Sequence, residues 1–265
     1  MLPARFTLHR PETIADALAL VAEHGDDATF YAGGTELLVA LKARVLRYGQ
    51  VVDIKRIQAL HGIAVREDGT LVIGALATHH QIATHPLVRE RLPAYAALSA
   101  DVANIRVRVA GTLGGNLCFA EPHADPPALL CALNARVVLA NEEGERSVPM
   151  REFILGEFTT ARSDGELLLR IEVPPLPAGA RAAYRAFGHL ERPAVGVAAL
   201  RKDGGGWQFW VGAIAGQPAV LDCAPQEVAA AAAGLEAHDD MHGSAEYKRH
   251  LVGVLARRAA KACEA

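Results

Sequence analysis

Two short stretches with paired glycines, residues 31–37 (YAGGTEL) and residues 110–118 (AGTLGGNLC), decide how this chain is interpreted. Glycine permits a positive φ and lets a ligand approach the backbone closely, and successive exposed N–H groups form a concavity suited to phosphate oxygens. Two such loops suit the two ends of a diphosphate. Neither stretch fits G-x-G-x-x-G, and no G-K-[ST] occurs in the chain, so a Rossmann or nucleoside triphosphate site is disfavoured.

The residue types in both loops are small or polar, as a backbone cradle requires. Each Gly-Gly pair alone is also compatible with a plain tight turn. As a cradle, the loops would offer backbone donors and hydroxyls from Gly33, Gly34, Thr35 and Glu36 on one side and from Thr112, Gly114, Gly115 and Asn116 on the other.

The composition is that of an ordinary globular protein, with 265 residues, 51% apolar and 22% charged. A net charge of -3 and a pI near 6.4 give no basic face for nucleic acid. The chain has no run of eighteen apolar residues and no signal-peptide pattern, so we expect it in the cytoplasm. Its four cysteines are scattered without a C-x-x-C pair, and its histidines match no zinc spacing, which argues against a metal site or a self-contained iron-sulfur cluster.

Hydrophobic periodicity divides the chain into alternating helices and strands. A Pro-Pro-Leu-Pro linker at residues 174–177 marks a domain boundary. After it, the turn KDGGG predicts a hairpin of residues 194–200 and 207–215. The patterns predict helices at residues 13–24, 36–45, 78–88, 95–103, 226–237 and 244–261, the last with Ser244 as N-cap, and strands at residues 27–31, 50–54, 70–74, 105–110, 135–140 and 165–173.

A family resemblance extends over nearly the whole chain. It rests on four segments in order, YAGGTELLVALK (31–42), VVDIKRI (51–57), IGALATHHQIATHPLV (73–88) and ANIRVRVAGTLGGNLCFAEPHADPPALLCALNARVVL (103–139), and on DDMHGSAE followed by YKRHLVGVLARRA near the end. The chain resembles the FAD-binding, or medium, subunit of the molybdenum hydroxylases, which include carbon monoxide dehydrogenases, xanthine dehydrogenases and aldehyde oxidases.

The resemblance implies an α+β fold of the vanillyl-alcohol oxidase/PCMH type. Two α/β FAD-binding subdomains would span residues 1–55 and 56–176, and a C-terminal domain of antiparallel sheet and helices would span residues 177–265. One noncovalently bound FAD would lie between the first two, with both glycine loops on its diphosphate. The matching positions are Ala32, Gly33, Gly34, Thr35 and Glu36 in the first loop and Thr112, Gly114, Gly115 and Asn116 in the second.

Further cofactor contacts are implied at positions that also have plain structural interpretations. Asp125 matches an acid near the ribityl chain and adenosine ribose, but it can equally cap a helix before Pro126. Leu168 matches a residue that packs on the isoalloxazine ring, or belongs to the core. Gly74 and Thr78 match positions near the cofactor, or a strand end and a helix cap.

The last domain departs from the family pattern. Arg185 is the nearest basic residue to the place where relatives often carry a lysine at the flavin edge, and a solvated arginine explains it as well. The segment LERPAVGV keeps Arg192 but lacks the acidic residue that often follows it in the family. This departure bears on the flavin edge, where the electron acceptor approaches.

The function implied is electron transfer within a larger oxidoreductase. The chain lacks a cysteine set for a [2Fe-2S] centre and a recognisable molybdopterin site, so these groups are expected on a small and a large partner subunit, in a dimer of heterotrimers. FAD would take electrons from the [2Fe-2S] centres and pass them to an external acceptor. Two alternatives are a stand-alone FAD oxidoreductase of the same fold and a flavin-free assembly protein. The substrate of the complex and its electron acceptor leave no mark on the chain.

Overall fold

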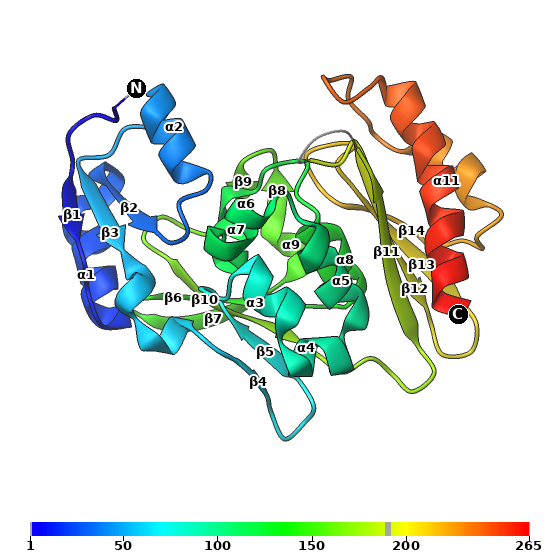
Figure 1. Ribbon diagram of the computed structural model, residues 1–265, viewed down its shortest axis with the longest axis horizontal. Helices are drawn as coiled ribbons and strands as arrows, with labels where there is room; N and C mark the ends of the chain where they lie inside the picture. The colour runs from blue at the N-terminus through cyan, green and yellow to red at the C-terminus, as the bar shows by residue number, and fades with distance from the viewer. Residues whose placement is uncertain (1, 189–191, 265) are drawn as a thin grey trace.

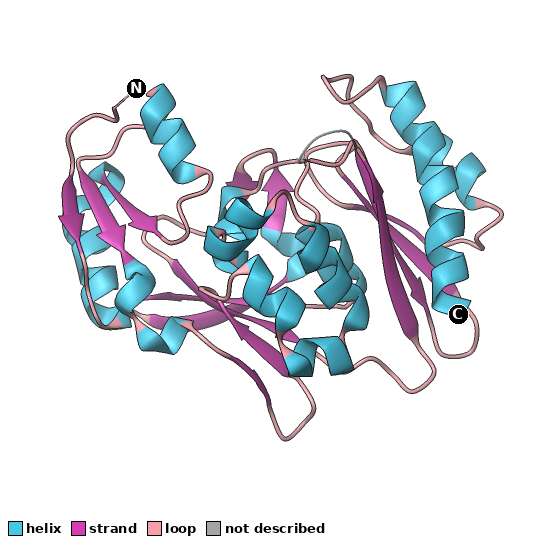
Figure 2. Cartoon of the chain, in the orientation of Figure 1, coloured by secondary structure: helices cyan, strands magenta, loops and turns pink. Residues whose placement is uncertain are grey.

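The computed structural model of the chain describes residues 2–188 and 192–264. Three main sheets follow one another along the sequence, and Figure 1 shows the first at the left, the second in the centre and the third at the right. Helices lie against each sheet, as Figure 2 shows by colour. The fold is therefore a mixed helix and sheet architecture.

The N-terminal part is a small parallel sheet in the order β1-β3-β2, flanked by helices. Its inner face packs on α1 and on the central sheet, because a single core cluster contains Leu18 of α1, Val52 of β3 and Leu169 of β10. The elements are β1 (Thr7–His9), α1 (Ile14–His24), β2 (Ala28–Tyr31), α2 (Leu37–Ala43) and β3 (Gln50–Asp53), with 3-10 turns at Gly25–Asp27, Ile54–Arg56 and Gln58–Leu60.

The central part is an antiparallel sheet in the order β4-β5-β10-β6-β7, covered by helices that supply most of the largest core cluster. Its strands are β4 (Ile63–Val65), β5 (Leu71–Gly74), β6 (Arg136–Asn141), β7 (Gly144–Pro149) and β10 (Leu167–Val173), and a short hairpin pairs β8 (Ile154–Gly156) with β9 (Thr159–Thr160). Its helices are α3 (His79–Thr84), α4 (Pro86–Arg91), α5 (Pro93–Asp101), α6 (Ile105–Ala110), α7 (Leu113–Phe119), α8 (Pro126–Ala132) and α9 (Met150–Phe153).

The C-terminal part is an antiparallel sheet in the order β11-β12-β13-β14 between two helical layers. One face packs on α11, and the other contributes Ala198 and Trp210 to the central core. Figure 1 shows α11 along the outer side of this sheet. The elements are β11 (Arg181–Phe187), β12 (Val195–Arg201), β13 (Trp207–Gly212), β14 (Ala219–Leu221), α10 (Val228–Ala231), a 3-10 turn at Ala232–Gly234 and α11 (Ala245–Glu264).

The strand expected at residues 105–110 is wrong, because this segment forms helix α6. The Asn104 side chain accepts hydrogen bonds from the N–H groups of Arg106 and Val107 and so begins the helix. Alternation of apolar and basic residues over six positions fits either structure. In the helix, Ile105 and Val109 lie one turn apart and are both 52% exposed.

Two expected helices are shorter than the sequence suggests. The helix from Thr78 to residue 88 is divided into α3 and α4 at His85, because the residue before a proline is disfavoured in helical conformation. The segment 226–237 forms only α10 and one 3-10 turn, after which Leu235 is extended. The expected C-terminal helix is present, and the Ser244 hydroxyl accepts from the N–H of Tyr247 in its first turn. Among the described helices, none has the length and apolar character to cross a membrane.

Candidate cofactor site

The first glycine loop connects β2 to α2 and presents a row of free backbone donors. The N–H groups of residues 33–36 donate to no acceptor within the described part of the chain. Gly34 has φ +74°, and a Cβ there would lie 2.5 Å from the Tyr31 ring, so only glycine fits. Successive unpaired N–H groups beside a left-handed residue form an anion-binding concavity. This loop therefore has the donors that a phosphate group needs.

A lysine lies beneath this loop. The Lys55 ammonium is 3.8 Å from the centroid of the Tyr31 ring and donates a hydrogen bond of 3.3 Å to the Ala32 carbonyl. It also pairs with Asp53 at 2.7 Å. Burial and the Asp53 charge raise the pKa of Tyr31, so this hydroxyl stays neutral at physiological pH. These contacts connect the start of the loop to the end of β3.

The second glycine pair lies in the first turn of α7 rather than in an open loop. The Thr112 side chain caps the helix by accepting from the N–H of Gly115 at 3.1 Å. The N–H of Gly114 donates to the Ala75 carbonyl at 2.9 Å, and that of Asn116 donates to the Thr112 carbonyl at 3.0 Å. The donors expected at Gly114, Gly115 and Asn116 are thus already paired inside the chain, which corrects their expected role as backbone donors.

The two glycine segments are in direct contact. A Cβ on Gly33 would lie 2.1 Å from the Ala110 carbonyl oxygen, and one on Gly111 would lie 3.3 Å from the Thr35 hydroxyl. A Cβ on Gly115 would be 4.0 Å from that of Ala32. In Figure 1 the segment after β2 accordingly lies beside α6 and α7. The fold brings the two segments, about eighty residues apart, into contact.

Within the second segment, the Asn116 side chain is the feature that indicates a ligand. Its Oδ1 atom is buried and has no hydrogen-bond partner in the chain, whereas buried polar atoms normally have one. Because no partner fixes the amide, either its oxygen or its NH₂ group can face a ligand. The free donors of the first loop and this unpaired amide together fit a phosphate-containing cofactor such as FAD.

Gly74 and Thr78 belong to the segment that supports α7. The chain from β5 to α3 runs beside it, with His79 N–H donating to Gly111 O at 3.1 Å and Leu113 N–H donating to Ala77 O at 2.9 Å. Thr78 and Gln81 form a capping box at the start of α3. A Cβ on Gly74 would lie 2.4 Å from the Leu60 carbonyl, so this glycine is needed for close packing.

Asp125 precedes α8 but makes no side-chain cap. Its carboxylate instead accepts a hydrogen bond of 2.8 Å from the hydroxyl of Tyr184 in β11. Burial raises the pKa of Asp125 to about 6. The residue therefore joins the central part to the C-terminal sheet, a contact that neither the expected cofactor role nor the expected helix cap includes.

Leu168 lies in the central core, and Arg185 lies exposed on β11. Leu168 is 3% exposed and belongs to the central core cluster. On β11, Tyr184 packs against the central core, whereas its neighbour Ala183 belongs to the cluster that contains α11. Since side chains alternate along a strand, exposed Arg185 shares the α11 side with Ala183. The solvated arginine considered from the sequence fits this position better than the flavin edge does.

The sequence interpretation missed a group of charged side chains beside the first loop. Arg192 pairs with both Glu36 and Glu121, and Glu121 contacts His123. In the sequence, Arg192 is recognisable only as a residue shared with the family. Its partners Glu36 and Glu121 come from distant segments, so no local pattern connects them to it. Among the described side chains, no group of three or more His, Cys, Asp or Glu is arranged to hold a metal ion.

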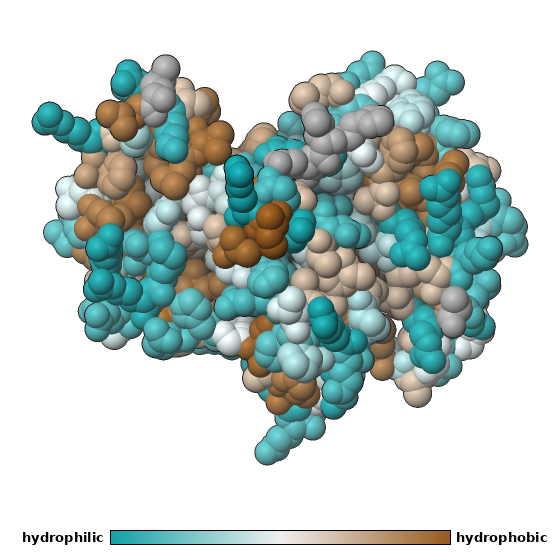
Figure 3. Space-filling model, viewed as in Figure 1, coloured by the Kyte–Doolittle hydropathy of each residue, from teal (hydrophilic) through white to brown (hydrophobic). Residues whose placement is uncertain are grey.

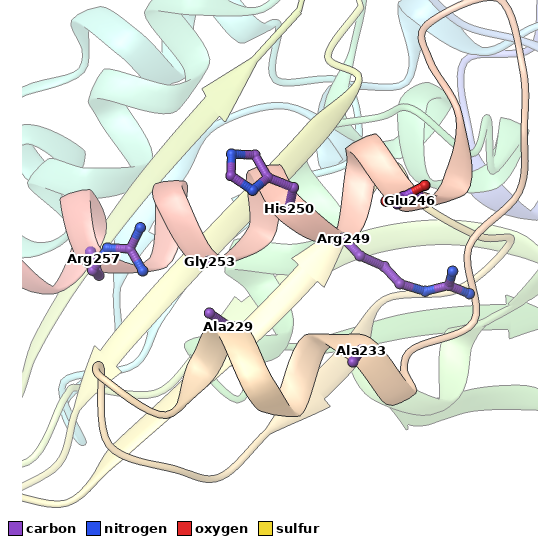
Figure 4. Close-up of a pocket in the computed structure, with 7 residues that line it drawn as sticks. All are labelled: Ala229, Ala233, Glu246, Arg249, His250, Gly253 and Arg257. Carbon is purple, nitrogen blue, oxygen red and sulfur yellow. The ribbon is translucent and has the colours of Figure 1, made fainter.

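A separate groove of about 410 Å³ lies in the C-terminal part, between α11 and the segment that contains α10 (Figure 4). Gly253 of α11 faces Ala229, and an added Cβ would lie 3.0 Å from the Cβ of Ala229. Small residues therefore let the two helices pack closely. The groove is lined by Ala229, Ala233, Glu246, Arg249, His250, Gly253 and Arg257, none of which belongs to either glycine segment.

Comparison with known families agrees with the glycine-loop geometry. Residues 4–176 match the model of the FAD binding domain in molybdopterin dehydrogenase, which covers both glycine segments and the whole central sheet. The chain belongs to this family. It is therefore a flavoprotein component of an oxidoreductase, with FAD as the cofactor of its family domain.

The chain is similar over nearly its whole length to subunits of dehydrogenases. It is 35% identical to the carbon monoxide dehydrogenase medium chain of Afipia carboxidovorans, covering 100% of this chain and 99% of that one. It is 32% identical to subunit alpha of the 6-hydroxypseudooxynicotine dehydrogenase complex of Paenarthrobacter nicotinovorans, covering 97% and 94%. The solved carbon monoxide dehydrogenase of Hydrogenophaga pseudoflava matches with a TM-score of 0.93 at 31% identity, covering 100% and 99%.

Proposed function

We propose that this chain is the electron-transfer subunit of a multi-subunit molybdenum hydroxylase. It would bind one FAD noncovalently, receive electrons from [2Fe-2S] centres of a small partner subunit, and pass them to an external acceptor. A large molybdopterin subunit would carry out hydroxylation, in a dimer of heterotrimers in the cytoplasm. The relatives named above are chains of such complexes, which supports a subunit rather than a stand-alone flavoenzyme.

The observation that carries this proposal is the contact between the two glycine segments. The N–H groups of residues 33–36 donate to no acceptor in the described part of the chain, and the contacting segment contains Asn116, whose buried Oδ1 has no partner. These groups would hold the diphosphate, with the N–H donors on its oxygens. Gly33 and Gly34 would let the loop pack against Ala110 and the Tyr31 ring, where a Cβ does not fit. FAD, once bound, exchanges electrons one or two at a time, and the protein supplies its position and electrostatic environment.

Other residues would contribute by shaping the surroundings of the cofactor. Thr112 and the Gly74–Thr78 segment would support α7 from behind, since their hydrogen bonds are internal. Asp125 would hold the C-terminal sheet against the central part through Tyr184. The four cysteines are free, and burial raises the pKa of Cys118 and Cys263 to about 11 and that of Cys131 to about 12. Those three thiols therefore stay protonated at neutral pH.

The first experiment is a visible absorption spectrum of the full chain expressed alone, followed by heat release and chromatography of the supernatant. We expect flavin absorption without iron-sulfur bands and about one FAD released per chain, as noncovalent binding at a single site requires. A colourless chain that does not take up added FAD would contradict the proposal and favour a flavin-free assembly protein. Flavin that stays with the denatured protein would contradict noncovalent binding.

A further inference from the structure

Arg192 connects the three parts of the molecule at the edge of the first glycine loop. Its side chain comes from the segment between β11 and β12. One nitrogen lies 3.0 and 3.1 Å from the two carboxylate oxygens of Glu36, and another lies 2.7 Å from Glu121. The rigid fork of a guanidinium suits such a double contact. Glu36 is the last of the residues 33–36 that bear the free N–H groups, so this contact fixes one end of that loop.

Arg192 is itself held on its far side by a chain of charges. Glu121, whose side chain is 10% exposed, accepts from the backbone N–H of His123 at 2.9 Å and lies 3.1 Å from its ring Nδ1. The other ring nitrogen is 2.8 Å from Asp240, which pairs with Lys248. The Lys248 side chain is only 1% exposed. This series of charged side chains thus extends from Arg192 to the buried side of α11.

The charges alternate along this chain. When His123 is protonated, the series contains three positively charged and three negatively charged side chains. Both ring nitrogens of His123 face carboxylates, and both then donate hydrogen bonds. An isolated exposed ion pair contributes little, but a network in which one guanidinium contacts two carboxylates, one of them nearly buried, is better held. Glu121 therefore restrains the Arg192 side chain, and Arg192 in turn restrains Glu36.

We propose that Arg192 is a positioning residue for the diphosphate loop and acts through Glu36. The loop between β2 and α2 has few backbone hydrogen bonds of its own, because its N–H groups are left free for the ligand. Arg192 holds the loop in its open arrangement before FAD binds, which lowers the ordering cost of binding. It also neutralises the Glu36 carboxylate, which would otherwise repel an anion nearby. The identity of the ligand rests on the proposed function, but the contact exists in the chain itself.

The first test is hydrogen exchange of the FAD-free full chain. The reporters are the amides of residues 38–40, which donate to the carbonyls of Gly34 and Glu36 and therefore lose protection when the loop loosens. In Arg192→Met these amides should exchange faster than in the unmodified chain. The matched control is Arg66→Met, which removes another arginine paired with a carboxylate: Arg66 lies 2.5 Å from Glu172 on β10 of the central sheet. Arg66→Met should leave exchange at residues 38–40 unchanged. Equal exchange in Arg192→Met and the unmodified chain overturns the proposal, whether or not the chain binds FAD.

The second test is a double-mutant cycle on FAD affinity, measured by titration of the full chain. Arg192→Met should weaken binding about tenfold, a change of about 1.4 kcal/mol. Glu36→Gln should also weaken it, and the double variant should bind no worse than Arg192→Met alone, because both changes remove one contact. Additive losses overturn the proposal. Arg192→Lys, which keeps the charge without the fork, should retain an intermediate affinity.

Two controls separate this proposal from other failures. Thermal unfolding of each variant shows whether it folds, and Glu36→Gln tests the same contact from the other end if Arg192→Met does not fold. An unmodified chain that binds no FAD contradicts the proposed function, and hydrogen exchange then decides the role of Arg192 by itself. Faster exchange confined to residues 38–40 supports positioning, whereas faster exchange over the whole chain shows general destabilisation and overturns it.

Discussion

At the scale of single residues, backbone requirements could be predicted from the sequence and side-chain partners could not. Gly33 and Gly34 are glycines because a Cβ would collide with Ala110 or with the Tyr31 ring, and paired glycines indicate such a need locally. The partner of Asp125 is Tyr184, 59 positions away, which no local pattern indicates. The same holds for Arg192 and Glu36, which are 156 positions apart.

Substitution of Gly33 tests the contact between the two glycine segments. In Gly33→Val, the added Cβ would lie 2.1 Å from the Ala110 carbonyl oxygen, so the segments must move apart. We expect loss of FAD binding and a fall of about 1–3 kcal/mol in the free energy of unfolding, as for other overpacked sites. FAD content after purification and denaturant unfolding measure the two effects. Gly234→Ala is the control, because a Cβ there meets nothing within 4 Å; retained FAD in Gly33→Val would show that the segments are misassigned.

At the scale of elements, the sequence predicts best where local chemistry decides. The KDGGG turn joins the expected strands β12 and β13, and α11 begins after Ser244, whereas β11, which follows the Pro-rich linker, is not among the expected strands. The interpretation fails at α6, where six residues fit two periodicities and the Asn104 cap decides for helix. It also fails at α7, where the donors of Gly114 and Gly115 are used by contacts with Ala75 and Thr112.

The packing of α10 on α11 gives a test at this scale. In Gly253→Leu, a side chain must enter the space where Ala229 lies 3.0 Å from the position of an added Cβ. The two helices must separate, so we expect a loss of about 1–3 kcal/mol, or a fall in Tm of about 2–4 °C per kcal/mol. FAD content per folded chain should not change. Gly253→Ala should lower the free energy of unfolding by less, because its smaller clash is offset by about 1 kcal/mol of helix propensity. An unchanged Tm in Gly253→Leu would rule out close packing here.

At the scale of the whole molecule, three sheets are joined by contacts between distant segments. The N-terminal sheet shares a core with Leu167 and Leu169 of the central sheet, and the C-terminal sheet contributes Ala198 and Trp210 to the central core. Figure 3 shows the surface hollowed between the parts at the left and right. The division at residues 1–55, 56–176 and 177–265 stays a prediction, supported by the order of the sheets. Composition and periodicity predict the sheets but not how they join.

The series of ion pairs around His123 links the parts of the molecule, and we expect its contribution to stability to depend on pH. Burial lowers the pKa of His123, but its hydrogen bonds to Glu121 and Asp240 outweigh burial, so its pKa is raised above 6.5. The folded protein then holds the proton more tightly than the unfolded chain does. The resulting stabilisation is complete below pH 6.5 and is lost as pH rises through the raised pKa. His242, whose ring centroid is 4.5 Å from that of His123, has the opposite shift, because burial and the His123 charge lower its pKa.

Replacement of His123 by glutamine should therefore remove part of the pH dependence of stability. In the unmodified chain, Tm should fall as pH rises from about 6.5 through the raised His123 pKa, and in His123→Gln this fall should be smaller. Thermal unfolding across this range measures it, and His242→Gln is the control that keeps the contacts of His123 to both carboxylates. Because the stabilisation from His242 is lost as pH falls below 6.5, outside this range, His242→Gln should leave the fall of Tm above pH 6.5 nearly unchanged. Parallel curves for the unmodified chain and His123→Gln would show that His123 is not charged between Glu121 and Asp240.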